Sequence, residues 1–252
     1  MKKKIFYSGC AAAAALLMGT FLTGYSSGKT IEGGGSPVVP NTTISYGVGG
    51  DERGEAVNGN VPQPEPAQST SVDLGLSVKW AAGNVGAENP EDYGLYFAWG
   101  ETEGFTAEQV TSGVRAFNSS EYSSGSAASI SANLTLAQDA ARANLGGKWR
   151  MPTKAEFQEL IDNCDVTWLS SYMGKGVAGR LYSSKINGNS VFFPATGFSD
   201  YSSVRYVGSL GYYWTASWRS VDGAWSLGFD SGLHNMYYCN KYCGFSVRGV
   251  CE

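Results

Sequence analysis

The sequence has a single histidine, His234, and only 16% of its 252 residues are charged. A histidine that serves as a general base needs a nucleophile and an orienting partner within hydrogen-bond reach. No motif around His234 supplies them, so we predict no catalytic residue and interpret His234 as a contact residue. Positive charge is also in the minority, with 18 lysine and arginine residues against 22 aspartate and glutamate residues. Because a nucleic-acid partner requires a concentrated basic face, the composition argues against one.

Cysteine is scarce as well, with five in the whole chain. Cys10 lies in the N-terminal segment, and the others are Cys164, Cys239, Cys243 and Cys251. None of them has the paired Cys or Cys/His spacing of a zinc site, so we predict no bound metal and no cofactor. An exported protein can form disulfides, and spacing alone leaves the pairing of these four cysteines open.

The N-terminal apolar stretch, from Cys10 to Leu22, is too short to cross a bilayer. Lysines at positions 2–4 precede it, which is the pattern of a secretory signal. We therefore predict a signal peptide at 1–25 and a protein exported to the cell surface, the periplasm or the medium. The next residues resemble a bacterial lipoprotein box, but Tyr25 stands where the lipid-bearing cysteine belongs. A secreted form and an altered anchor site both stay open, and a lipid anchor is the sole membrane contact that the sequence suggests.

Residues 26–70 are rich in Gly, Pro, Ser, Thr and Asn. Such a segment buries too little apolar surface to offset its chain entropy, so we predict a flexible tether. The folded domain is predicted for residues 71–252. A chain that is 42% hydrophobic and 13% aromatic has enough apolar surface for a real core.

The folded domain is predicted to be α+β. Capping-box sequences begin at Thr135 and Thr153, and each predicts that a helix starts at the next residue. We expect one helix over 136–145, ended by Gly146, and a second over 154–164. Strands are expected at 72–80, 93–100, 191–194, 212–214, 224–229 and 245–250.

An apolar stripe marks the side of the second helix that packs on the core. Its members recur at helical spacing: Phe157, Leu160, Ile161 and Cys164. We expect these residues, together with Trp149 and Trp214, to be buried, and the Cys164 thiol to be free.

The last third of the chain, from Gly211 onward, alternates large apolar residues with small or aromatic polar ones. Because a strand buries alternate side chains, the pattern predicts a rigid sheet with a frame pointing inward and a contact surface pointing outward. The expected frame is Tyr213, Trp214, Leu227, Phe229, Phe245 and Val247. Tyr, Ser, Gly and Asn, which recur between them, are also the residues that antibody paratopes favour. The predicted ligand-binding residues are Trp218, Arg219, Ser226, Gly228, Asp230, His234, Asn235, Tyr237, Tyr238, Cys239, Asn240, Tyr242 and Cys243.

Trp218 and Arg219 are included because Trp and Arg dominate the hot spots of binding interfaces. The alternative for Trp218 is a half-buried ring that covers the turn after it. Cys239 and Cys243 are expected to be dispensable for folding, since they belong to the predicted surface set.

Two segments resemble a known family. The formylglycine-generating-enzyme branch of the C-type lectin fold has the signature W-R-L-P-T-x-x-E-W, and W-R-M-P-T-K-A-E-F at 149–157 is similar to it. The segment G-F-S-V-R at 244–248 resembles the G-F-R-V closing strand of the same group. The domain thus resembles exported lectin-fold domains of gut Bacteroidetes and paralogous domains of Fibrobacter. This implies a C-type lectin-like fold with two helices and a twisted antiparallel sheet, but one fold carries many functions.

Some proteins of this group are variable targets of diversity-generating retroelements, which randomise adenines in C-terminal codons. From an Asn codon such as AAC, this yields Tyr, Cys, Ser, Gly, Asp and His. The predicted contact residues from Ser226 to Cys243 belong to that set. Diversification and the ordinary abundance of these residues in surface turns both stay open.

We predict a ligand-binding module that holds a protein or glycan ligand without metal or cofactor. A structural adhesin or fimbria-associated envelope component is one alternative. A second is a formylglycine-generating-type oxidase, in which Cys239 and Cys243 would be redox-active or copper-binding. The calcium-dependent sugar site of animal C-type lectins needs Glu-Pro-Asn or Gln-Pro-Asp together with Trp-Asn-Asp, and neither is present, so no calcium requirement is expected.

Overall fold

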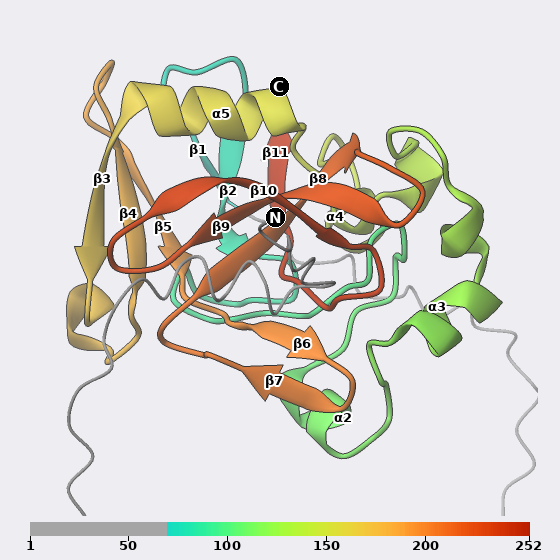
Figure 1. Ribbon diagram of the computed structural model, residues 1–252. Helices are drawn as coiled ribbons and strands as arrows, with labels where there is room; N and C mark the ends of the chain where they lie inside the picture. The colour runs from blue at the N-terminus through green and yellow to red at the C-terminus, as the bar shows by residue number, and fades with distance from the viewer. Residues whose placement is uncertain (1–69) are drawn as a thin grey trace, which may run out of the picture. The chain divides into compact units, whose positions relative to one another are not determined.

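The computed structural model describes residues 70–252, which form an α+β fold of short helices and several antiparallel sheets (Figure 1). The predicted signal peptide at 1–25, with Tyr25, and the predicted tether up to residue 69 lie outside the described residues. Residues 70–252 belong to one compact unit. Within this range, no helix is long and apolar enough to cross a membrane.

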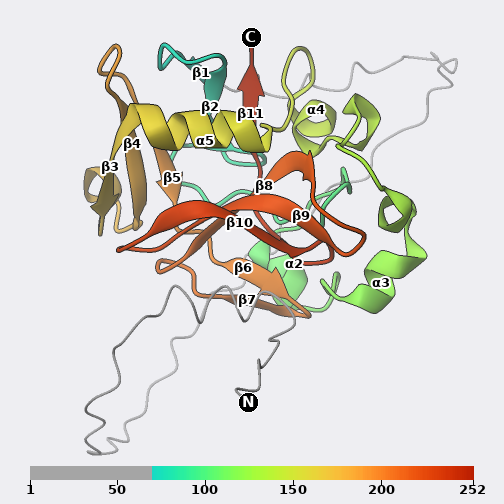
Figure 2. The same ribbon diagram turned by 45° about the horizontal axis from the view of Figure 1, so that its top comes forward.

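A three-stranded antiparallel sheet lies at the centre of the fold (Figure 2). Its order is β10-β9-β8, and all three strands come from the segment predicted to contain only strands and turns. The register between β8 and β9 shifts after Trp214, so that Trp218 pairs with Ala224. The strands are β8 (Gly211–Trp218), β9 (Gly223–Phe229) and β10 (His234–Asn240).

Helix α5 (Lys154–Asn163) lies across one face of this sheet (Figures 1 and 2). Thr153 Oγ1 accepts a hydrogen bond from the Glu156 backbone N–H at 3.2 Å, and Glu156 Oε2 accepts one from the Thr153 N–H at 2.7 Å. This reciprocal capping starts the helix where the sequence predicts. The helix ends at Asn163 rather than 164, because Cys164 has extended backbone (φ -119, ψ 148) and opens the next strand.

The single helix predicted over 136–145 is wrong, because the chain forms two pieces there. A 3₁₀ turn, η2 (Leu136–Gln138), precedes helix α4 (Ala140–Leu145). Asp139 separates them in an extended conformation, and its carboxylate accepts hydrogen bonds from the backbone N–H groups of Arg142 at 2.9 Å and Met151 at 2.8 Å. Buried Asp139 therefore caps the true helix. Gly146 ends α4 with a positive φ of 66°, as the sequence predicts.

Three smaller sheets and several short helices complete the fold. The strand predicted at 72–80 forms only at its two ends, and the segment predicted at 93–100 contributes isolated bridges at Tyr96 and Phe97. Helices α2 and α3 and strands β3 and β4 have no counterpart in the sequence prediction. The sheets are β1-β2-β11, β3-β4-β5 and β6-β7. Their strands are β1 (Ser71–Val72), β2 (Lys79–Asn84), β3 (Cys164–Leu169), β4 (Gly179–Ser184), β5 (Ser190–Pro194), β6 (Phe198–Asp200), β7 (Ser203–Arg205) and β11 (Arg248–Cys251). The helices are α2 (Ala107–Thr111) and α3 (Ser119–Ser124), with 3₁₀ turns η1 (Ser126–Ser129) and η3 (Tyr172–Gly174).

The central sheet separates two large apolar clusters. Alternate residues of β8 point to opposite faces, so Tyr213 joins the cluster under α5 whereas Tyr212 and Trp214 join the other. The cluster under α5 also contains the predicted stripe residues Phe157 and Leu160. All six residues expected in the core are accounted for: Trp149, Phe157, Leu160, Cys164 and Trp214 are buried, and Ile161 is partly buried. Cys164 carries a free thiol.

A buried arginine joins three strands. The Arg248 side chain is fully buried, and its guanidinium donates to the backbone carbonyls of Ala81 at 2.9 Å, Ala82 at 2.5 Å and Phe192 at 2.8 Å. It also lies over the Phe193 ring, 4.5 Å from the centroid. Burial lowers the pKa of Arg248 to about 10, so the group stays charged at neutral pH.

Replacing Leu160 by alanine is expected to lower the free energy of unfolding by about 2–5 kcal/mol, because it opens a cavity between α5 and the sheet. Leu136, which is 53% exposed in η2, offers a matched Leu-to-Ala control. Leu136→Ala should change the free energy by less than about 0.5 kcal/mol. Urea denaturation measures both, and equal midpoints for the two variants would contradict the packing of α5.

Candidate functional site

Part of the predicted contact surface is buried. Ser226 is 0% exposed, Cys239 4% and Cys243 1%, and Gly228 is buried as well. The expectation that these residues are displayed is therefore wrong. Strand β9 is the middle strand of a sheet that is covered on both faces, so its residues are buried on either face except Trp225, which is partly exposed. The expectation that Cys239 and Cys243 are dispensable loses its basis, because both thiols pack in a core cluster.

The remaining predicted residues do not converge on one surface. Cross-strand pairs share a face, so the pairing of Tyr238 with Trp225 places Tyr238 on the α5 side of the sheet. Asn235 and Tyr237 pair with Gly228 and Ser226 and lie on the opposite side. Tyr237 and Tyr242 pack partly buried against the cluster there, and Asn240 donates to the Tyr242 hydroxyl at 2.8 Å.

Asp230 and His234 flank the β9–β10 turn beside an arginine that the sequence did not single out. Arg180, on β4, is 4% exposed and donates through Nε to the Asp230 carbonyl at 2.9 Å. The His234 ring meets the buried Tyr182 ring edge-on, with 6.2 Å between centroids. Burial lowers the pKa of His234, and the charge of Arg180 lowers it further. The imidazole is therefore neutral at physiological pH.

The most distinctive exposed feature is an aromatic–cation cluster, formed by Lys154, Arg219, Trp225 and Tyr238. Lys154 Nζ lies 3.5 Å from the centroid of the Trp225 ring. The guanidinium of Arg219 lies 5.8 Å from the same centroid and 5.1 Å from that of Tyr238. The two rings meet edge-to-face, with 6.0 Å between centroids. Each cation–π contact is worth about 0.5–1 kcal/mol at an exposed site, enough to orient both cations.

Four parts of the chain build this cluster. Lys154 is the first residue of α5, Trp225 and Tyr238 come from neighbouring strands, and Arg219 lies in the β8–β9 turn. The Lys154 backbone N–H donates to Ser217 Oγ at 2.9 Å, which ties the start of the helix to the end of β8. Tyr238 remains 59% exposed.

A hollow of about 580 Å³ adjoins the cluster. Its size lies within the range of small-ligand sites. Trp218 forms part of the wall, and its backbone N–H donates to Asn133 Oδ1 at 2.9 Å. The Trp218 indole Nε1 is buried and has no acceptor among the described residues. The hollow is lined by Asn133, Thr153, Lys154, Ala155, Gln158, Ser217, Trp218 and Trp225.

The site therefore keeps Trp218, Arg219 and Tyr238 of the predicted set and adds Lys154 and Trp225. Lys154 belongs to the recognised segment at 149–157, where the sequence marks it only as part of a helix cap. Trp225 lies two residues before the buried Leu227 in β9, so both side chains are on the α5 side of the sheet. The sequence could have found it once the β9–β10 register was known, but no local signal fixes that register.

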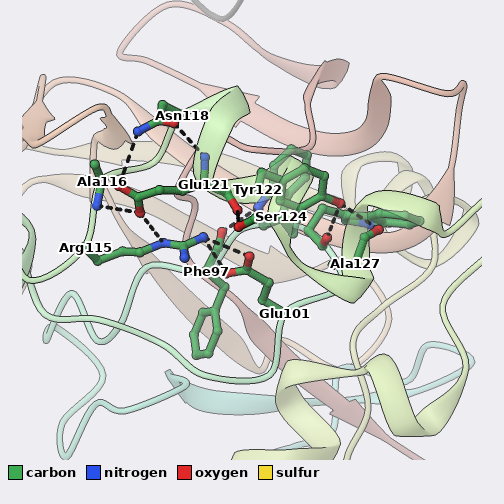
Figure 3. A network of polar contacts seen from close by, with 11 residues as sticks. Phe97, Glu101, Arg115, Ala116, Asn118, Glu121, Tyr122, Ser124 and Ala127 are labelled. Atoms are coloured by element: carbon green, nitrogen blue, oxygen red, sulfur yellow. Dashed lines mark hydrogen bonds and ion pairs between the residues drawn. The ribbon is translucent and has the colours of Figure 1, made fainter.

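A second hollow, of about 350 Å³, contains an ion-pair network (Figure 3). Arg115 Nη2 lies 2.8 Å from both carboxylate oxygens of Glu101, and Arg115 Nε lies 3.8 Å from Glu121 Oε2. Tyr122, beside it, donates to the carbonyls of Trp99 at 2.8 Å and Ala127 at 3.1 Å. These contacts join α3 to the loops around it. We interpret the network as structural, because the charges are already paired with one another.

No group of three or more His, Cys, Asp or Glu side chains that could hold a metal occurs within residues 70–252.

Comparison with known families gives one match. Residues 175–250 match the model of a family described as a domain of unknown function, DUF8237. The matched segment runs from the loop before β4 to β11 and contains the whole central sheet. Comparison with curated proteins and with solved structures finds no match.

The burial of Gly228 predicts that a larger side chain is not tolerated there, whereas its exposed partner on β10 should tolerate substitution. A Cβ atom at Gly228 would lie 2.7 Å from Tyr237 Cδ2 and 3.1 Å from Tyr212 Cε1. Gly228→Ser is therefore expected to destabilise the fold by about 1–3 kcal/mol through overpacking. Asn235, its exposed cross-strand partner, provides the control, and Asn235→Ser should change stability by less than about 0.5 kcal/mol. Thermal denaturation measures both, and equal melting temperatures would contradict the burial.

The Glu101–Arg115 pair predicts a pH-dependent stability. Burial raises the pKa of the Glu101 carboxyl, and the charge and hydrogen bonds of Arg115 oppose that shift. Without Arg115 the folded-state pKa should rise further, so ionising Glu101 costs more stability as pH rises. We expect Arg115→Gln to lose about 1–3 kcal/mol at pH 7 and clearly less near pH 4, where the carboxyl is protonated in both states.

Glu101→Gln is the control for this pair, because it leaves Arg115 beside Glu121 and removes the titrating group. Its stability loss should be smaller and should not grow from pH 4 to pH 7, because the raised pKa of Glu101 means that this carboxyl stabilises the wild type less as pH rises. Denaturant titrations at the two pH values measure both variants. If Arg115→Gln loses the same stability at both pH values, the charge of Arg115 does not affect the ionisation of Glu101.

Proposed function

We propose that this chain is an exported ligand-binding protein with a C-type lectin-like fold, and that it binds a protein or glycan ligand through the aromatic–cation cluster and its hollow. The observation that carries the proposal is the pair of partly buried Trp225 and exposed Tyr238, with Lys154 and Arg219 held on its rings. Export rests on the N-terminal sequence pattern alone. The ligand would lie on another cell or in the surroundings.

The roles of the recognised segments support the C-type lectin-like fold. In the segment at 149–157, Trp149 and Phe157 are buried, and Arg150 pairs with Glu156 at 2.6 Å. In the closing segment, Phe245 and Arg248 are fully buried. Because these residues form the core, segments of this kind are expected to be shared by proteins with the same fold, whatever their activity.

The composition of the cluster supports binding. Trp, Tyr and Arg are the residues that contribute most at binding hot spots, because they offer large contact areas and several donors. The cation–π contacts restrict the long side chains of Lys154 and Arg219 before any ligand arrives. Less conformational entropy is then lost on binding.

The oxidase alternative would need accessible thiols at Cys239 and Cys243, and their burial lends it no support. The diversified-protein interpretation concerns the predicted positions from Ser226 to Cys243, of which Asn235 and Tyr238 are exposed. The adhesin alternative uses the same surface toward a partner subunit, and a co-purifying fimbrial protein would favour it.

Substitution of Tyr238 tests the proposal. Tyr238→Ala should weaken binding to whichever partner the wild-type chain recognises by at least about tenfold, because a hot-spot residue contributes about 2 kcal/mol or more. Tyr201, which is 63% exposed beside the β6–β7 turn, gives a matched control on another part of the surface, and Tyr201→Ala should bind like wild type.

The measurement is the dissociation constant of the full chain on arrays of immobilised glycans and of extracellular proteins. Binding that is lost in Tyr201→Ala and kept in Tyr238→Ala would place the contact surface elsewhere. The absence of binding to both arrays would count against a ligand-binding function.

A further inference from the structure

We propose that the ligand of the aromatic–cation cluster is an acidic sugar, in which a carboxylate meets Lys154 and Arg219 and a sugar ring packs on the aromatic wall. This inference rests on the proposed ligand-binding function and specifies its chemistry. The charge of the cluster, the hydrogen-bonding state of the hollow and its shape carry the argument.

The two cations lack carboxylate partners. Neither Lys154 nor Arg219 takes part in an ion pair among residues 70–252, and neither head group has a hydrogen bond there. Asp222, in the same turn as Arg219, instead exerts its charge on Lys241. Both positive charges lie near one indole ring, and we expect an anionic group bound there to be attracted to both. Charge-assisted hydrogen bonds of this kind are about twice as strong as neutral ones.

Three polar oxygens of the hollow already accept a hydrogen bond from the backbone. Asn133 Oδ1 accepts from the Trp218 N–H, Thr153 Oγ1 from the Glu156 N–H, and Ser217 Oγ from the Lys154 N–H. The first bond also fixes the orientation of the Asn133 amide, because only its oxygen can accept. The Asn133 amide nitrogen and the Ser217 hydroxyl hydrogen therefore remain as donors without acceptors among the described residues.

Gln158 is the exception, and it suits a sugar. Its Nε2 donates to Asp162 Oδ1 at 2.9 Å, which leaves its carbonyl oxygen to accept. A sugar hydroxyl both donates and accepts, so it can use this group next to the donors. Inorganic anions cannot donate to it when fully ionised.

The shape favours a small ligand over a protein partner. The hollow of about 580 Å³ is the size of a small-molecule site, whereas a stable protein interface covers about 800 Å² on each side. The C–H face of a pyranose ring is apolar and slightly positive, so it packs well against the electron-rich face of Trp or Tyr. Aromatic walls with neutral amides and hydroxyls, together with Lys154 in the wall and Arg219 in the adjoining cluster, match a sugar that carries a carboxylate.

Titration calorimetry with matched sugars tests the inference. The probes are oligosaccharides that contain galacturonate, glucuronate or N-acetylneuraminate, each compared with its methyl ester, which keeps the ring and removes the charge. We expect at least one acid to bind the full chain and its ester to bind at least about tenfold more weakly. Binding of the acid should also weaken as salt is raised.

Charge-removing variants locate the contact. Lys154→Gln and Arg219→Gln should each weaken binding of the acid by at least about tenfold while leaving the weak binding of the ester unchanged. Lys148→Gln and Arg205→Gln remove exposed charges of the same type elsewhere and should bind like wild type. Melting temperatures equal to that of the wild type ensure that a loss of binding is not a loss of folding.

Each other outcome overturns the inference in a recognisable way. Equal affinity for acid and ester, lost in Tyr238→Ala, would mean a neutral sugar and would leave the proposed binding function standing. Binding of a polyglutamate peptide in place of all three acidic sugars would mean an acidic protein partner. Binding of none of these probes would exclude an acidic ligand, and the array measurement would then decide the binding function separately.

Discussion

The fold depends on one buried cation, the guanidinium of Arg248. It bonds to carbonyl groups of β2 and β5 from its own position in β11, so three strands that are distant in sequence share one donor group. Arg248 forms no ion pair with a carboxylate within residues 70–252. The backbone carbonyls and the Phe193 ring must compensate its charge, and this works only if all the strands are in place. The last strand thus joins β2 to β5, in the middle of the chain.

This arrangement surrounds the central sheet and limits where a ligand can bind. With α5 and the β3-β4-β5 sheet contributing to one cluster, and α4 with the loops around α2 and α3 contributing to the other, both faces of β9 are covered. The proposed ligand contacts are therefore expected where a cover ends. The aromatic–cation cluster lies at such a place, where α5 begins and β8 turns into β9. Its position therefore follows from where α5 begins as much as from the residues that form it.

The sequence predicts local features well and the relations between them poorly. The Thr153 capping box and the Phe157–Leu160 spacing predict α5 almost to the residue, because both signals act within one helical turn. The Thr135 capping box is equally good locally, yet the helix breaks at Asp139, whose carboxylate is recruited by the distant Met151 N–H. Alternation in β9 predicts that Leu227 and Phe229 are buried, but it cannot show that the opposite face is buried too. Arg180 and strands β3 and β4 carry no local signal at all.

The same distinction explains the two kinds of residue in the predicted surface set. Ser226, Gly228, Cys239 and Cys243 are small because a second core cluster leaves them little room, as the close approach of Tyr237 to Gly228 shows. Arg219 and Tyr238 are large and exposed, so nothing in the packing dictates their identity. Small residues and contact residues look alike in a single sequence, since both break an apolar pattern. The two kinds of residue can be distinguished only when it is known which faces of the sheet are covered by other elements. If this protein changes its ligand through substitution, the change must therefore occur around the hollow beside α5, where Lys154 and Trp225 form a fixed base and Arg219 and Tyr238 can vary without disturbing the core.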